Sequence, residues 1–187
     1  MTKGGSMLIE ARAVLTLNPR GLLRMSDLGR DEVREMLLFG RARVGGGAGP
    51  VDSVEASILD HATGKATWTP PATYYLGLST TTPTDAAGNF TEPVGNNYAR
   101  VNIAVADWNV ASGTAPVTST NANQISFAAA SGSWGTLTYA GLFAAVSGGT
   151  HLWFGALTAS ATVGSGGTVT FAASNLILQL GDPTDTY

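Results

Sequence analysis

The chain has 187 residues, which is enough for one ordinary domain with a hydrophobic core and an appendage. Hydrophobic residues make up 44% of it but charged residues only 12%, well below the roughly 25% of an average soluble domain. Cysteine is absent, which excludes a disulfide framework, a thiolate nucleophile and cysteine metal sites. The surface must consist largely of Thr, Ser, Asn, Gly and Ala, as in exported β-structures and in assemblies whose surfaces are buried by neighbours.

Charge is distributed unevenly along the chain. Residues 1–50 hold eight basic and five acidic residues, a net charge of +3, whereas residues 51–187 hold two basic and eight acidic residues, a net charge of −6. The glycine-rich stretch from Gly45 to Pro50 separates the two parts. We therefore predict an N-terminal attachment arm over residues 1–50 and a body over residues 51–187.

The N-terminus has no apolar run of the kind found in signal peptides, because Glu10 and Arg12 interrupt it. No stretch approaches the roughly 18 apolar residues that a membrane span needs. We expect a protein that is made in the cytoplasm without a signal peptide and that does not enter a membrane.

The arm begins with a weak strand pattern over residues 11–17 and continues with a predicted helix over residues 27–39. Ser26 or Asp27 can cap this helix, and Gly40 ends it. Basic and acidic residues alternate on it, which favours an amphipathic helix that docks on a neighbouring protein over a nucleic-acid-binding surface. The candidate docking residues are Val33, Arg34, Met36, Leu37, Arg41 and Arg43.

A second helix is predicted directly after the arm. Asp52 and Glu55 have the spacing of a capping box with Asp52 in the cap position, and Val54 and Ile58 lie on one apolar stripe. Gly64 can end the helix in the left-handed conformation.

From Tyr74 onward, apolar residues alternate with a period of two, which is the pattern of half-buried strands. Glycine-rich and asparagine-rich turns separate the strands, and no helical pattern lies between them. We predict a mainly β fold, an antiparallel β-sandwich of about seven strands. The predicted strands cover residues 74–79, 100–105, 124–129, 137–143, 151–157, 168–172 and 175–180.

Residues that could support catalysis or hold a metal are few. His61 and His151 lack the cysteine or carboxylate pattern of a metal site. Asp85, Asn89 and Glu92 offer oxygen ligands in one loop, but their spacing does not match a calcium-binding EF-hand, so a plain turn is favoured. No catalytic motif is present, and we predict neither an enzyme nor a cofactor.

Three tryptophans are candidate ligand or interface residues: Trp108, Trp134 and Trp153. Such rings can stack on a sugar of a host-surface glycan. For Trp108 and Trp134, the alternative that the ring closes the core of the sandwich is favoured.

The body, from about residue 51 to residue 180, resembles a family of small virion proteins of tailed bacteriophages, the tail fibre or minor tail proteins. The resemblance rests on a succession of landmarks: ILDHATG, TPPATYYLGLSTTTPTD, TEP before NNYARVNI, ISFAAASGSWGTLTYAGLFAAVSGG, LWFGALTASATVGSGGTVTF and LILQL. It implies a structural, non-enzymatic virion component, and by analogy a homo-oligomer, with a trimer as the first guess. The arm lies outside the resemblance.

Three interpretations of the function follow. In the first, the chain is a tail, tail fibre or neck protein whose arm docks on another virion protein, while the sandwich projects or packs against copies of itself. In the second, it is a capsid decoration or head fibre protein. In the third, which belongs to another functional class, it is a carbohydrate- or receptor-binding module.

Overall fold

The computed structural model describes residues 8–10, 13–17, 49–113 and 117–180. Helix α2 covers Asp52–Ala62, and the 3-10 turn η2 covers Val105–Asp107. The strands are β1 (Leu8–Glu10), β2 (Ala13–Leu17), β3 (Gly49–Pro50), β4 (Thr73–Ser79), β5 (Val101–Ala104), β6 (Val117–Thr120), β7 (Ile125–Ser126), β8 (Gly135–Phe143), β9 (His151–Val163), β10 (Thr168–Phe171) and β11 (Leu176–Leu180).

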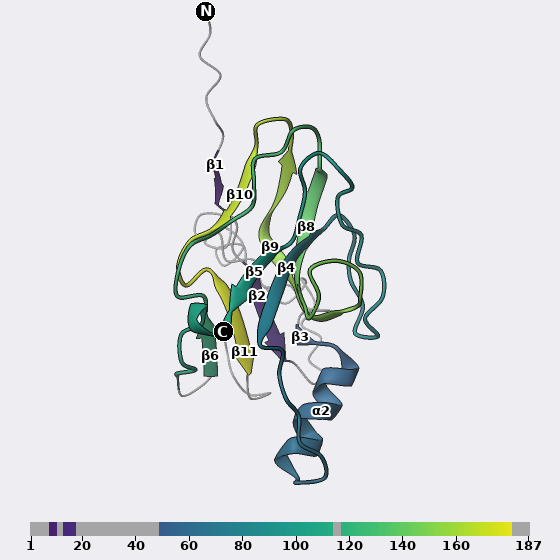
Figure 1. Cartoon of the computed structure of the whole chain (residues 1–187), viewed down its shortest axis with the longest axis vertical. Helices are drawn as coiled ribbons and strands as arrows, with labels where there is room; N and C mark the ends of the chain where they lie inside the picture. The colour runs from purple at the N-terminus through teal and green to yellow at the C-terminus, as the bar shows by residue number, and fades with distance from the viewer. Residues whose placement is uncertain (1–7, 11–12, 18–48, 114–116, 181–187) are drawn as a thin grey trace, which may run out of the picture.

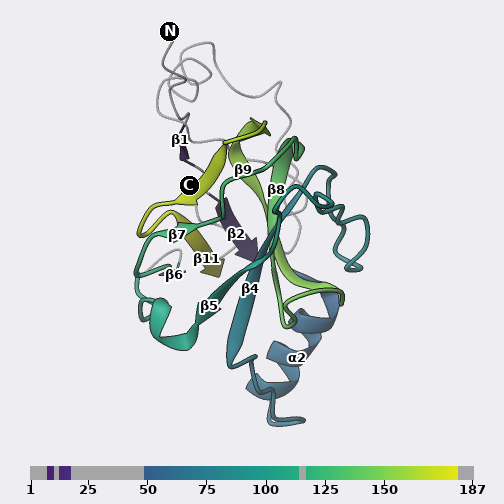
Figure 2. The same ribbon diagram turned by 45° about the horizontal axis from the view of Figure 1, so that its top comes forward.

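These strands form two sheets. The larger has the order β5-β4-β8-β9-β2-β11-β6, with β3 also paired to β9, and the smaller has the order β1-β10-β7. Strands β4, β8 and β9 lie side by side at the centre, and α2 extends from one end (Figures 1 and 2). Leu76 and Phe154 of the large sheet share one buried cluster with Ile125 and Phe171 of the small sheet, so the core lies between the sheets.

The predicted mainly β fold with antiparallel sheets is confirmed. Each of the seven predicted segments contains a strand, although β9 continues to Val163 and β6 was not predicted. Two strand pairs are parallel, β1 with β10 and β2 with β11. Turn signals cannot reveal such pairs, because they join segments that are far apart in the sequence.

Strand β2 lies inside the large sheet, between β9 and β11. Residues from the predicted N-terminal arm therefore take part in both sheets through β1 and β2. The predicted helix over residues 27–39 lies outside the described residues, and the division of the chain near residue 50 remains a prediction.

Helix α2 begins where β3 ends. Its N-cap is Val51 rather than Asp52, and no side chain caps it, so the predicted capping box is wrong. The reason is that the backbone of Val51 is held extended by a 3.0 Å hydrogen bond from its N–H to the carbonyl of Leu152.

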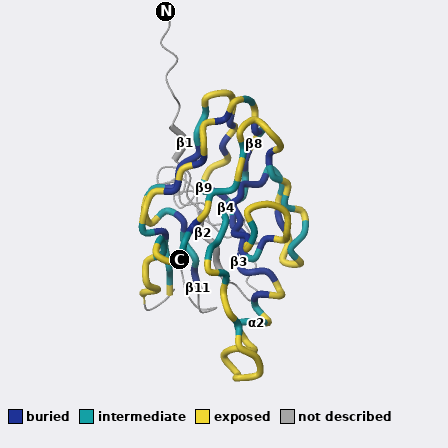
Figure 3. Tube along the Cα trace, in the orientation of Figure 1, coloured by how far each residue is buried: buried dark blue, intermediate teal, exposed yellow. Residues whose placement is uncertain are grey.

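Gly64 has the expected left-handed conformation, with φ of +72°. Exposed residues gather at the far end of α2 and in the turn after it (Figure 3).

The two outer strands of the large sheet are connected through the chain between them. The N–H of Asn109 donates to the carbonyl of Thr120 over 2.8 Å, and the N–H of Ala122 donates to the carbonyl of Asp107 over 2.7 Å. The segment that leaves β5 thus pairs with β6, which lies at the opposite end of the strand order. Pairing of this kind protects the edge of β6 that does not contact β11.

Candidate functional site

Two glycines lie opposite each other in the centre of the large sheet, Gly77 in β4 and Gly141 in β8. A Cβ atom at Gly141 would collide with the ring of Phe90, and one at Gly77 would come within 2.9 Å of Glu92 Oε1. Their neighbours Leu76 and Leu78 point into the core, so the glycines face the other side of the sheet. The absence of side chains here lets residues 80–100 lie directly on the sheet, and we call these residues the loop layer.

Aromatic side chains hold the loop layer on the sheet. Phe90 packs edge-on against Phe143 of β8, with ring centroids 4.9 Å apart, and its centroid is 5.2 Å from that of His151. His151 is buried, and its Nε2 lies 3.3 Å from the carbonyl oxygen of Thr84. Burial lowers the pKa of His151, which favours the neutral ring. Its role in the fold is to pack beneath the loop layer.

The charged pair of Glu92 and Arg100 ties the loop layer together. Arg100 Nη2 lies 2.6 Å from Glu92 Oε2, and Arg100 Nε donates to Glu92 Oε1 over 2.9 Å. Only 4% of the Arg100 side chain is exposed, and its guanidinium carbon lies 3.3 Å from the centroid of the Phe143 ring. This two-pronged geometry is the strongest form of an Arg–carboxylate contact.

The same pair connects the loop layer to other parts of the body. Arg100 Nη1 donates to the carbonyls of Ala145 and Gly148 over 2.8 Å each, which fixes the turn between β8 and β9. The hydroxyl of Tyr98 donates to Glu92 Oε1 over 2.8 Å and accepts from the N–H of Leu78 over 2.8 Å. Burial and the neighbouring Glu92 carboxylate raise the pKa of Tyr98, so the hydroxyl stays protonated as a donor.

The structure shows why the loop that contains Asp85, Asn89 and Glu92 is a turn. The Glu92 carboxylate is engaged by Arg100 and Tyr98, and the Asn89 side chain donates to the carbonyl of Thr82 over 2.7 Å. Within the described residues, no group of three or more His, Cys, Asp or Glu residues could hold a metal ion.

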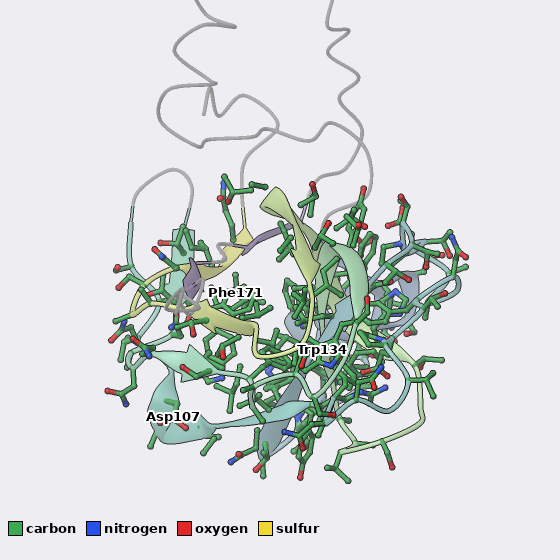
Figure 4. All side chains as sticks on the ribbon, turned by 90° about the horizontal axis from the view of Figure 1, so that it is seen from above. Asp107, Trp134 and Phe171 are labelled. Carbon is green, nitrogen blue, oxygen red and sulfur yellow. The ribbon has the colours of Figure 1, made fainter. Side chains whose placement is uncertain are left out.

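Trp134 joins the loop layer to the start of β8. The ring is buried, and its Nε1 donates to the carbonyl of Asn96 over 2.9 Å. The Asn96 side chain donates in return to the carbonyl of Ser133 over 2.9 Å. Tyr98 packs edge-on against the tryptophan, with ring centroids 5.3 Å apart. Seen from above, Trp134 points into the interior of the body, as Phe171 does (Figure 4).

The other two candidate tryptophans lie elsewhere. Trp153 of β9 is buried, and Trp108 is half-buried and packs edge-on against Tyr74 at 6.3 Å. The Nε1 atom of Trp108 is buried without a hydrogen-bond partner among the described residues. The structure therefore does not bring the three tryptophans together, and a stacking role for them remains a prediction.

A small polar groove lies between β5 and the segment that precedes and includes β7. Its volume is about 270 Å³, and its lining includes Asn102, Asp107, Asn123, Gln124 and Ser126. Asp107 lies at the margin of the body (Figure 4), where its Oδ2 accepts from the N–H of Ala104 over 3.0 Å.

A comparison with protein families gives a match that covers the loop layer and the strands β4, β8 and β9 that support it. The family is described as "Podophage GP4 fiber I protein gp80", and the match extends over residues 50–179. The chain belongs to this phage fibre family. A comparison with curated proteins finds no match. The chain is thus a structural fibre protein of a bacteriophage, as the resemblance in the sequence implied. No helix in the described part of the fibre protein is long and apolar enough to cross a membrane.

The landmarks of the sequence resemblance come together in the fold of the fibre protein. Asn96 and Arg100 belong to the segment TEPVGNNYAR, Trp134 belongs to SGSWG, and Gly77 belongs to YLGLS. Hydrogen bonds and ring contacts join these segments around the loop layer.

Sequence reasoning missed the pair of Glu92 and Arg100. A signal was present, because Arg100 is one of only two basic residues in residues 51–187 of the fibre protein and lies next to a strand pattern. A lone cation in such a place needs a carboxylate partner, and Glu92 lies eight positions earlier in the sequence. The candidate docking residues between Val33 and Arg43 lie outside the described residues.

Proposed function

We propose that the body of this fibre protein is a rigid, non-enzymatic building block and that its N-terminal segment attaches it to another virion protein. In this proposal the bodies project from the virion or pack against copies of themselves. The observation that carries it is the extent of the family match, which covers residues 50–179 and leaves residues 1–49 outside. A segment that lies outside the shared body is where a fibre protein can adapt to its own attachment site.

The charge of the two parts supports this division of roles. Eight of the ten basic residues lie in residues 1–50, whereas residues 51–187 carry a net charge of −6. The segment between β2 and β3, residues 18–48, contains Arg30, Arg34, Arg41 and Arg43 along with Val33, Met36 and Leu37. Arginine and methionine side chains are enriched in protein contact surfaces.

The body has the properties of a rigid block. Both faces of β4 and β8 are covered, one by the core and the other by the loop layer. The buried pair of Glu92 and Arg100 fixes two loops with five hydrogen bonds, including those to Ala145 and Gly148. Loops held in this way keep one shape during assembly, which lowers the entropic cost of forming contacts.

The test must spare β2, because removal of residues 1–49 would open the large sheet between β9 and β11. We therefore suggest replacing residues 18–48 with a neutral Gly/Ser linker of the same length, in a phage whose own copy is deleted. We expect the purified variant to keep the thermal midpoint of the body and to be missing from purified virions, as measured by quantitative mass spectrometry.

The control is Gly164→Ala, a change in a β9–β10 turn where an added Cβ meets nothing within 4 Å. It should enter virions at the normal copy number. Incorporation of the linker variant at that same copy number would show that residues 18–48 are not the attachment segment.

A further inference from the structure

Exposed apolar side chains of the body concentrate in one short stretch. Among the described residues, three of the six most exposed large hydrophobic side chains lie between residues 105 and 117, and they are Val105, Val110 and Val117. Val110 is the most exposed of the three, at 90%. We call residues 108–113 and 117–120 the valine hairpin.

Backbone hydrogen bonds join the two arms of the valine hairpin. Ser112 and Thr118 exchange two bonds of 2.9 and 2.8 Å, and the N–H of Asn109 donates to the carbonyl of Thr120 over 2.8 Å. Ser112 lies opposite Thr118 and Trp108 opposite Asn121, so Val110 and Val117 lie on the two arms of one small ribbon, which follows β5 and covers the edge of β6.

The outer edge of this ribbon is unpaired. No hydrogen bond in the described part of the chain involves the backbone of Val110 or Ala111. Such an edge is a template on which another strand can pair, and most proteins protect it with lysine, other charges or proline. Residues 108–112, WNVAS, contain none of these.

The lack of charge extends far beyond the hairpin. Residues 108–181 contain no Asp, Glu, Lys or Arg, whereas an average soluble domain has about one charged residue in four. A charged partner would leave its charges unpaired on this surface, which is costly when they are buried. A neutral surface rich in Ala, Ser and Thr loses little side-chain entropy on contact and fits an equally neutral surface.

We propose that the valine hairpin is the surface through which copies of this chain contact one another, edge to edge. A second copy brings the same neutral surface and the same unpaired N–H and C=O groups. In an antiparallel arrangement each edge satisfies the groups of the other, and the valines of both copies are removed from water together. The proposed function includes bodies that pack against copies of themselves, and this inference rests on that proposal. What it adds is the surface through which two copies contact each other.

The test compares three variants of the full chain that place the same charge at different exposed apolar positions. Val110→Glu changes the hairpin, whereas Val94→Glu in the loop layer and Leu59→Glu on α2 are matched controls, with exposures of 91% and 65%. Self-association is measured by sedimentation equilibrium, and thermal unfolding is followed by circular dichroism. We expect Val110→Glu to raise the dissociation constant at least about tenfold and both controls to change it by less than about twofold.

All three variants should unfold within about 2 °C of the wild type, because the substituted side chains are exposed. Val110→Lys should weaken association as Val110→Glu does, since either charge is excluded from an apolar contact. If the wild-type chain oligomerises but Val110→Glu does so equally well, the hairpin is not the contact, although the packing of bodies stands. If the wild-type chain is monomeric at every concentration, both the hairpin contact and the packing of bodies are wrong.

Discussion

Trp134 connects two segments that are far apart in the sequence. Its indole N–H donates to the carbonyl of Asn96, and its ring fills the space beside Tyr98 and Phe127. Trp134→Phe keeps most of the ring but removes the hydrogen bond, so we expect it to lower the free energy of unfolding by about 1 kcal/mol. Trp134→Ala also leaves a cavity and should cost about 3–5 kcal/mol.

Urea denaturation of both Trp134 variants measures these two losses separately. If Trp134→Ala were as stable as the wild type, the ring would have no part in the packing, and its role as a ligand platform would become the better interpretation.

His151 makes the stability of the body depend on pH. Burial lowers the pKa of His151 in the folded state, whereas in the unfolded chain the pKa has its ordinary value of about 6.5. As the pH falls below about 6.5, the unfolded state therefore takes up a proton on His151 before the folded state does. The contribution of His151 to stability is thus complete above about pH 6.5 and is lost as the pH falls through the lower pKa of the folded state. We expect the thermal midpoint of the wild type to fall on going from about pH 7.5 to about pH 5.5.

The control is His151→Gln, whose side chain can still donate to the carbonyl of Thr84 but does not titrate. Its thermal midpoint should fall less over the same pH range. Identical pH profiles of the two proteins would mean that His151 is not the group responsible.

At the scale of elements, the close approach of the loop layer to β4 and β8 depends on Gly77 and Gly141. In Gly141→Ala the added methyl group would collide with the Phe90 ring and lie 3.1 Å from the carbonyl oxygen of Trp153. We expect a loss of about 1–3 kcal/mol in the free energy of unfolding, as for other overpacked sites. Gly164→Ala, which meets nothing within 4 Å, should change it by less than about 0.5 kcal/mol. Equal stability of the two variants would contradict the close contact.

The ion pair of Glu92 and Arg100 joins the loop layer to the turn between β8 and β9. Arg100→Ala removes the donor to the carbonyls of Ala145 and Gly148 and leaves the Glu92 carboxylate with only the hydroxyl of Tyr98 as donor. We expect it to lower the free energy of unfolding by about 3 kcal/mol, the lower end for breaking a buried pair, because Glu92 is partly exposed.

Lys65 is the matched control for Arg100, since these are the only basic residues of the body and Lys65 is exposed. Lys65→Ala should be within about 0.5 kcal/mol of the wild type in the same denaturation experiment. Comparable losses for both variants would show that net charge, rather than the buried contacts of Arg100, controls stability.

Local patterns were sufficient to predict most elements of this fold. Period-two alternation located the strands from β4 to β11 except β6, whose residues VTST have no apolar side at all. The parallel pairing of β2 with β11 could not be predicted, because it depends on segments separated by most of the chain. The loop layer was missed for a related reason: its polar turns look like ordinary loops, and only the fold places Gly77 opposite Gly141.

At the scale of the whole molecule, charge is segregated. Asp52, Glu55, Asp60 and Asp85 lie on or beside α2, and burial together with the Asp52 and Asp85 carboxylates raises the pKa of Glu55. The strands from β6 to β11 contain no charged residue. The molecule therefore has acidic residues gathered around α2, a long uncharged stretch suited to close contact, and eight of its ten basic residues in residues 1–50. This distribution agrees with a fibre protein that is attached through one segment and packs through another surface.

The central claim is that this chain is a fibre component of the virion, and its copy number in purified particles tests that claim most directly. Quantitative mass spectrometry, with the major capsid protein as the internal standard, gives this number. We expect the chain to be present at a small multiple of the symmetry of the tail, because fibres attach at a few equivalent positions. A copy number on the order of hundreds, as in a protein that repeats over the capsid, or absence from purified particles would contradict it.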